Sequence, residues 1–99
     1  MFEGNRVHPR DVDAAISKIE FLLLPDGRTT LCTLTLDNGF TVHGMAACVD
    51  RANYIKATGE DNALQKAKDK VWELLGFRLA DMLAHTAALD APYGKLPPC

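Results

Sequence analysis

Apolar and polar positions alternate on both sides of the turn sequence PDGR, at residues 25–28. This two-residue period is typical of β-strands and predicts a hairpin within residues 18–36. A turn of two or four residues sends the large apolar side chains of both strands to one face of the sheet. The expected cross-strand pairs are Leu23 with Thr30, Phe21 with Cys32 and Ile19 with Leu34.

The sequence DNG, at residues 37–39, predicts a second hairpin and allows two registers. A two-residue turn of Asn38 and Gly39 would pair Leu36 with Thr41. A three-residue loop with Gly39 in the left-handed conformation instead pairs Leu36 with Phe40. We favour the three-residue loop, because it brings every large apolar side chain to one core face. That face comprises Ile19, Phe21, Leu23, Cys32, Leu34, Leu36, Phe40 and Val42.

Helical periods flank the predicted strands. Residues 8–19 place Pro9 and two aspartates where a short helix begins. After the sheet, Asp50 is expected to cap a short helix within residues 50–57. The expected buried stripe of the N-terminal helix is Val12, Ala15, Ile16 and Ile19.

The C-terminal third predicts two further helices. Thr58, followed three residues later by Asp61, resembles a capping box that opens the first of them. Gly76 is expected to end it, and residues 77–89 are expected to form the next one. Prolines predict an irregular tail from about residue 90. The expected inward positions are Leu64, Ala67, Val71, Leu74, Leu75, Leu79, Met82, Leu83 and Thr86.

These elements predict an α+β fold in a single domain covering residues 1–99. Its centre is a three-stranded antiparallel β-meander, with an N-terminal helix and C-terminal helices packed on it. A chain of 99 residues with 47% hydrophobic content suits one core. Leu22, Leu24 and Leu31 would face away from that core, so another element or another subunit should cover them.

Composition limits the cellular compartment and the binding partners that we expect for this protein. No apolar run approaches the roughly 20 residues needed to cross a bilayer, and the start lacks the order of a secretory signal. We therefore expect a cytoplasmic protein without a membrane partner. Cys32, Cys48 and Cys99 show no metal-site spacing, and free thiols are expected for the first two. Eleven basic against 13 acidic side chains argue against polymeric nucleic acid but leave a small anion as a candidate.

The sequence contains no recognisable catalytic arrangement. Ser17 is the only serine, and His8, His43 and His85 are widely separated along the chain. A nucleophile with an oriented histidine base therefore has no sequence support. No glycine-rich phosphate loop or HExxH pattern occurs either. We expect a protein that is not an enzyme and needs no cofactor or metal.

A recognition surface is the remaining candidate. A nucleotide-like ligand needs an aromatic plate for its base, worth about 1 to 3 kcal/mol by stacking, and cationic donors for its phosphates. Tyr54 and neighbouring cations would supply both. The alternative that Tyr54 packs against Trp72, with the cations solvated at the surface, stays open. The candidate residues are Arg28, Arg51, Asn53, Tyr54, Asn62, Lys66 and Arg78.

The stretch CTLTLDNGFTVHGMAACVDRANY, followed by Trp72 in KVWELLGFRL, resembles the signature of a family of small tailed-phage proteins. That signature reads C-x-L-x-L-x-NGF-x-V-x-G, then small-small-C-V-D, then W-x-L-x-G-aromatic. The similarity covers residues 31–79. The family is identified as including the first-described type of Thoeris anti-defence protein, a sponge for immune signalling nucleotides.

The resemblance implies a phage sponge that sequesters cyclic ADP-ribose isomers, and by extension cyclic oligonucleotides, in the cytoplasm of an infected bacterium without cleaving them. It also implies a homo-oligomer built from dimers, with a hexamer as the expected assembly. A different function for such a protein is an interaction module whose apolar outer sheet face binds a host or phage protein.

Individual residues follow from the same resemblance. The family's aromatic residue falls on Tyr54, its following glycine on Gly59 and its tryptophan on Trp72. A family Asn-Ala pair falls on Lys66 and Ala67, where this chain departs from the pattern. Tyr54 is then expected to stack on the base, within a ligand site comprising Arg28, Tyr54, Asn62, Lys66 and Arg78. Gly44 and the small residues after it are expected to allow close packing and to bring residues 50–54 to the pocket edge.

Overall fold

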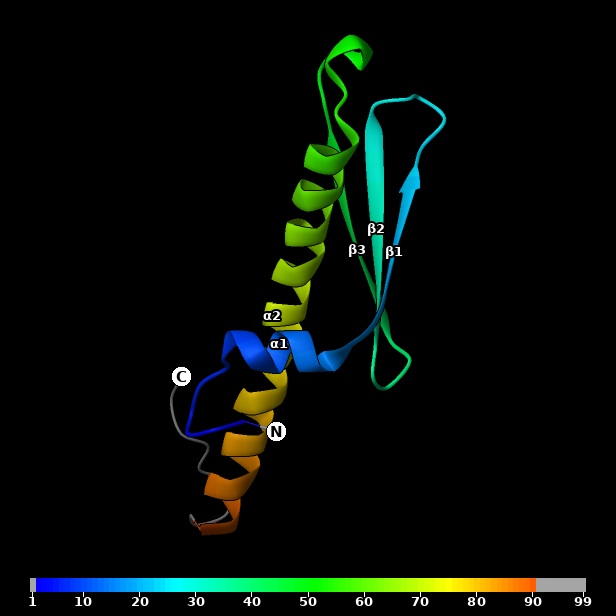
Figure 1. Cartoon of the computed structure of the whole chain (residues 1–99). Helices are drawn as coiled ribbons and strands as arrows, with labels where there is room; N and C mark the ends of the chain where they lie inside the picture. The colour runs from blue at the N-terminus through cyan, green and yellow to red at the C-terminus, as the bar shows by residue number, and fades with distance from the viewer. Residues whose placement is uncertain (1, 91–99) are drawn as a thin grey trace.

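The computed structural model describes residues 2–90, with side chains up to residue 85. The elements are α1 (Pro9–Ala15), β1 (Ile16–Leu23), β2 (Thr29–Leu36), β3 (Thr41–Ala47), the 3-10 helix η1 (Arg51–Asn53) and α2 (Lys56–Asp90). The strands form one antiparallel sheet in the order β1-β2-β3, and α2 runs along it (Figure 1). This arrangement confirms the predicted α+β class. The expected irregular tail lies outside the described residues.

Both hairpins have the predicted registers. Ile19 lies opposite Leu34, Phe21 opposite Cys32 and Leu23 opposite Thr30. In the second hairpin, the Leu36 N–H donates to the Phe40 carbonyl at 2.8 Å. Gly39 has a φ of 87°, as the three-residue loop requires. The turn sequences and the alternation of apolar residues were therefore sufficient to set strand pairing.

The C-terminal helices are one continuous helix, which corrects the prediction. α2 runs through Gly76, where the sequence predicted an end, and Thr58 lies inside its first turn. The short helix expected within residues 50–57 is reduced to η1, whose cap is Asp50 accepting from the Ala52 N–H at 3.0 Å. An isolated glycine costs a helix only about 1 kcal/mol. Burial of one uninterrupted apolar stripe outweighs that local cost.

The core lies between α2 and the strands β2 and β3. Cys32, Leu34, Leu36 and Val42 are buried there as predicted, together with Ala63, Ala67, Val71 and Leu75 of α2 and with Val12 and Ala15 of α1. The remaining four residues of the predicted core face are exposed: Ile19 by 45%, Phe21 by 38%, Leu23 by 46% and Phe40 by 57%. A helix with its side chains is about 10 to 12 Å across, so a single α2 covers two strands spaced about 4.8 Å apart, but not three.

Several residues that were predicted to face inward are exposed or lie in another element. Leu79 is buried and Leu64 is half-buried, whereas Leu74, Met82 and Leu83 are exposed. α1 ends at Ala15, so Ile16 and Ile19 belong to β1. The side chain of Thr86 lies outside the described set. On the outer sheet face Leu22 is 58% exposed, so no described element supplies the cover expected for it.

Gly44 sets the distance between the sheet and α2. A Cβ atom at this position would lie 2.4 Å from both the Ala63 carbonyl oxygen and the Ala67 backbone nitrogen. Those neighbours are backbone atoms, so they have no rotamer by which to move away. The small side chains of Ala63 and Ala67, both buried, complete this close contact. Gly44 lies within β3 opposite Cys32, so the chain does not leave the sheet at this residue as expected. The expected close packing is present, between β3 and α2.

Candidate functional site

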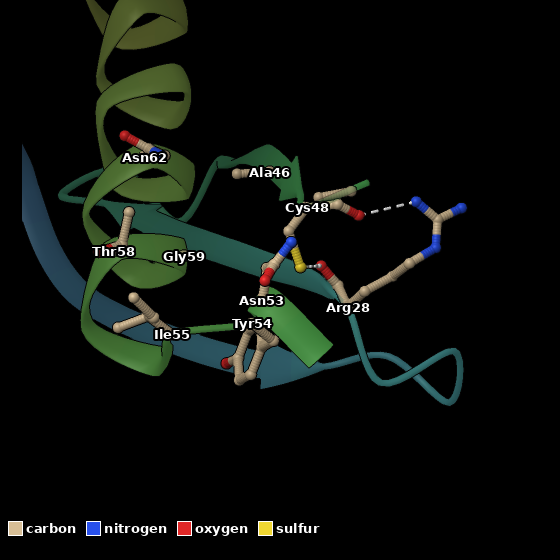
Figure 2. Close-up of a pocket in the computed structure, with 10 residues that line it drawn as sticks. Arg28, Ala46, Cys48, Asn53, Tyr54, Ile55, Thr58, Gly59 and Asn62 are labelled. Atoms are coloured by element: carbon tan, nitrogen blue, oxygen red, sulfur yellow. Dashed lines mark hydrogen bonds between the residues drawn. The ribbon is translucent and has the colours of Figure 1, made fainter. Parts of the chain in front are cut away.

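A hollow of about 170 Å³ lies at the end of the sheet where α2 begins (Figure 2). Its walls come from the start of β2, the end of β3, η1 and the first turns of α2. The lining residues are Arg28, Ala46, Ala47, Cys48, Asn53, Tyr54, Ile55, Thr58, Gly59 and Asn62. The small residues after Gly44 thus form one wall of the hollow as well as closing the sheet-helix contact.

Tyr54 is half-buried beside the hollow and is not sealed in the core. Its hydroxyl lies 3.4 Å from the hydroxyl of Thr30, which is itself buried. A Cβ atom on Gly59 would lie 2.7 Å from the Thr30 hydroxyl oxygen and 3.3 Å from the Tyr54 ring carbon Cε1. Gly59 therefore leaves the space in which the Tyr54 ring rests against α2.

Arg28 supplies the positive charge of the hollow. Its Nη1 donates to the Cys48 carbonyl at 3.0 Å, which ties the start of β2 to the end of β3 (Figure 2). Arg51 adds a second guanidinium nearby, because a Cβ atom on Gly27 would lie 2.9 Å from the Arg51 Nε. The turn between β1 and β2 therefore has a cation on each side.

Asp26 fixes the shape of that turn. Its Oδ1 accepts from the N–H groups of Arg28 and Thr29 at 3.0 and 2.9 Å, and its Oδ2 accepts from the Thr29 hydroxyl at 2.6 Å. These hydrogen bonds, that of the Thr29 hydroxyl first, hold the pKa of the Asp26 carboxyl below its ordinary value of 3.8. Arg28 therefore leaves the turn from a fixed backbone position.

The structure brings together three of the five predicted ligand residues: Arg28, Tyr54 and Asn62 all line the hollow. Lys66 is exposed one helical turn beyond Asn62 and does not line it. Arg78 lies about 24 Å farther along the α2 axis than Asn62, from the helical rise per residue. Arg78 lines a different hollow with Phe40 and Phe77, so the structure does not bring it together with Tyr54 within one subunit.

Trp72 does not pack with Tyr54, contrary to the alternative left open by the sequence. It lies about 24 Å along the α2 axis from the start of the helix, from the same rise, and packs partly buried against the core. Asn53 and Thr58 also line the hollow, although neither belongs to the predicted ligand site. The position of Asn53 directly before Tyr54 was the available signal for it.

Among the described serine, histidine and cysteine side chains, Cys48 lines this hollow, and the others do not. The Ser17 hydroxyl donates to the Thr35 carbonyl at 3.0 Å, and His43 Nδ1 lies 3.0 Å from the Thr33 hydroxyl. Cys32 and Cys48 are free thiols, and burial raises the pKa of Cys32. Within residues 2–90, no group of three or more histidine, cysteine or acidic side chains is placed to hold a metal ion.

Comparison with known families gives a match over most of the chain. The sequence model of the phage protein family described as N4 Gp49/phage Sf6 gene 66 matches residues 7–83. The chain belongs to this phage protein family. No curated protein and no solved structure matches the chain significantly.

The part shared with the N4 Gp49/Sf6 gene 66 family contains the whole sheet and the first turns of α2. It therefore includes every residue that lines the hollow beside Tyr54. In the part of the chain that the structure describes, no helix combines the length and the apolar character that crossing a membrane demands.

Proposed function

We propose that this phage protein is an anti-defence sponge that binds a nucleotide-derived immune messenger and releases it unchanged. The expected ligands are cyclic ADP-ribose isomers, followed by cyclic oligonucleotides, in the cytoplasm of the infected bacterium. The observation that carries the proposal is the hollow that the half-buried Tyr54 and the cationic residue Arg28 line together. The sequence resemblance supplies the ligand class.

The side chains around the hollow suit the parts of such a ligand. The Tyr54 ring offers a face for stacking a base, and Arg28 offers N–H donors for phosphate. Asn53 and Asn62 carry amides that both donate to and accept from ribose hydroxyls or base edges. The first turn of α2 lies at the same hollow, and the N–H groups of a helix start favour an anion.

The hollow is small for a whole messenger. Its volume of about 170 Å³ is below the roughly 300 to 1,000 Å³ of typical ligand pockets. We therefore expect the hollow to hold one base or one phosphate, with the rest of the ligand bound at its rim. Lys66, one turn along α2, and a second subunit of the proposed dimer-based oligomer are the available contributors.

A sponge acts by affinity alone. A nanomolar Kd corresponds to about 12 kcal/mol of binding free energy, which depletes a signal when the protein is abundant. Isothermal titration calorimetry with a panel of cyclic ADP-ribose isomers and cyclic dinucleotides tests the proposal. Loss of stacking in Tyr54→Ala should weaken binding by about 1 to 3 kcal/mol, or roughly 5- to 150-fold in Kd.

Two further variants sharpen this test. Gly59→Ala should weaken binding while the Tyr54 side chain is retained, because the new methyl group would crowd the Thr30 hydroxyl and, less closely, the Tyr54 ring. Arg78→Ala is the matched control, since Arg78 lines a different hollow. The ligand recovered after denaturing the protein should have an unchanged mass, whereas a hydrolase would return altered ligand. Absence of heat with every nucleotide, or equal affinity in Tyr54→Ala, would reject the sponge.

A protein-interaction module is the second candidate, because the outer sheet face has an unusual apolar row. Leu22 pairs with Leu31, and Leu31 pairs with Met45, so the row crosses all three strands. Leu22 and Met45 are 58% and 54% exposed. Cross-linking in infected cells should then capture a host or phage protein, and Leu22→Ser with Met45→Ser should abolish the capture. The sponge requires no such partner.

A further inference from the structure

The strand β1 is the least protected element of the sheet. Every residue from Ser17 to Leu23 is exposed. Four of them are large and apolar: Ile19, Phe21, Leu22 and Leu23, with exposed fractions between 38% and 58%. β1 is also an edge, since only β2 pairs with it among the described residues (Figure 1). Its apolar surface therefore spans both faces of an open edge.

The backbone of β1 presents hydrogen-bonding groups along that edge. The Leu24 N–H donates to the Thr29 carbonyl at 2.8 Å, which directs the backbone of Leu24 toward β2. Direction alternates along an antiparallel strand. The N–H and C=O groups of Ile19, Phe21 and Leu23 therefore point away from β2, toward the open edge.

The usual protection of edge strands is missing from this segment. Natural edges are blunted by proline, by bulges or by charges that repel a second strand. In β1 the only irregularity in the pairing is between Ile16 and Lys18, before the apolar part. The two charges, Lys18 and Glu20, have opposite signs and lie 3.6 Å apart, so they add no net repulsion.

The accessible surface of the chain is large enough to leave room for a partner. The chain exposes 6982 Å² at a mass of 10.8 kDa, whereas a compact monomer of this mass exposes about 5,500 Å². A stable interface takes about 800 Å² from each partner. The four exposed apolar side chains of β1 would contribute part of that area.

We propose that a second copy of this chain pairs with β1 in antiparallel orientation, forming a six-stranded sheet across a two-fold axis. A two-fold contact joins the same patch on both subunits, and the β1 edge is suited to pairing with itself. A register centred on Ile19 places the Lys18 ammonium opposite Glu20 of the partner subunit, twice. A register centred on Glu20 would oppose like charges and is disfavoured. The resemblance implied an oligomer without indicating a surface, and this proposal names one.

The β1 edge is distinct from the nucleotide hollow, because no residue of β1 lines that hollow. Tyr54 also lines a neighbouring hollow with Phe21 and Leu23, so nucleotide binding is measured in the Phe21 variants as well. Sedimentation equilibrium of the full chain should give twice the mass of a 10.8 kDa monomer, or a multiple of that dimer. Phe21→Ser removes one apolar side chain and should raise the Kd of the dimer about 10-fold. Phe21→Pro also removes an outward N–H, and edge strands tolerate proline there, so it should raise the Kd by more than about 100-fold.

Met45→Ser is the matched control, because Met45 is a large apolar residue exposed on the other edge strand, β3. It should leave the dimer intact. Amide exchange of the unmodified chain gives a second test that needs no variant. The Ile19 and Phe21 amides should exchange slowly when the protein is concentrated and faster on dilution, while the Leu22 amide, bonded to β2, should stay protected. A monomeric chain, a Phe21→Pro variant that remains dimeric, or rapid exchange of the Ile19 and Phe21 amides at every concentration would overturn the proposal.

Discussion

The strands β3 and β1 are the two edges of one sheet, but α2 covers the inner face of β3 and leaves that of β1 exposed. β3 carries small residues on its inner face, and α2 approaches it so closely that Gly44 has no room for a methyl group. β1 carries Ile19, Phe21 and Leu23 on the same face, and all three are exposed. The edge with small side chains is covered, and the edge with large ones is open.

The difference shows how side-chain size directs packing in a sheet wider than one helix. Small residues let two backbones come close, so α2 packs on the inner faces of β3 and β2. Large apolar residues on β1 hold no contact with that helix deep enough to bury them. Burial of these side chains would have to come from outside the subunit, as in the β1 pairing proposed above.

The largest expected effect on stability comes from substituting two residues that face each other across β1 and β2. Leu34 is fully buried, whereas its cross-strand partner Ile19 is 45% exposed. Leu34→Ala should lower the free energy of unfolding by about 2 to 5 kcal/mol, through lost burial and a new cavity. Ile19→Ala should lower the free energy of unfolding by less than about 1 kcal/mol in dilute protein, where no second subunit covers the open edge of β1.

Urea denaturation at two protein concentrations measures both losses. The cost of Ile19→Ala should grow at high concentration if the residue is buried between subunits, because only the assembled state then contains its contacts. The cost of Leu34→Ala should be large at both concentrations. Equal costs for the two substitutions in dilute protein would remove the distinction between a covered and an open strand.

The second test addresses the close approach of β3 to α2. Gly44→Ala should destabilise the fold by about 1 to 3 kcal/mol, because the added methyl group meets backbone atoms of Ala63 and Ala67 that cannot rotate away. Gly76→Ala is the matched control, since nothing lies within 4 Å of a Cβ at that helical glycine. It should stabilise the protein by about 0.5 to 1 kcal/mol. Thermal unfolding of both variants checks the opposite signs.

The strand pairing could be predicted from the sequence because its signals are local. The PDGR and DNG turns fix where each strand reverses, and the alternation of apolar residues then leaves one consistent register. The continuity of α2 could not be predicted in the same way. The choice between ending and continuing at Gly76 depends on whether residues on both sides bury a shared stripe, which is a tertiary property.

The residues of the candidate site show the same contrast between local signals and tertiary structure. Arg28, Tyr54 and Asn62 come together at one end of the sheet, because the first hairpin turn and the start of α2 meet there. Arg78 lies apart from them within the subunit, because α2 continues through Gly76. In a continuous helix, the 16 residues between Asn62 and Arg78 become about 24 Å of axis instead.

The smallest expected effect concerns the turn that holds the open strand β1 against β2. Hydrogen bonds from Thr29 and Arg28 lower the pKa of the Asp26 carboxyl below 3.8 in the folded state. A lowered folded pKa means that Asp26 contributes stability above its unfolded pKa and loses it as the pH falls through the folded value. Asp26→Asn should therefore lower the Tm slightly at pH 7, and the gap to the unmodified chain should close as the pH falls below about 3.8. A gap that is constant from pH 7 to pH 2.5 would show that the Asp26 charge does not strengthen the turn, and the order of β1 would then depend on its pairing with β2 alone.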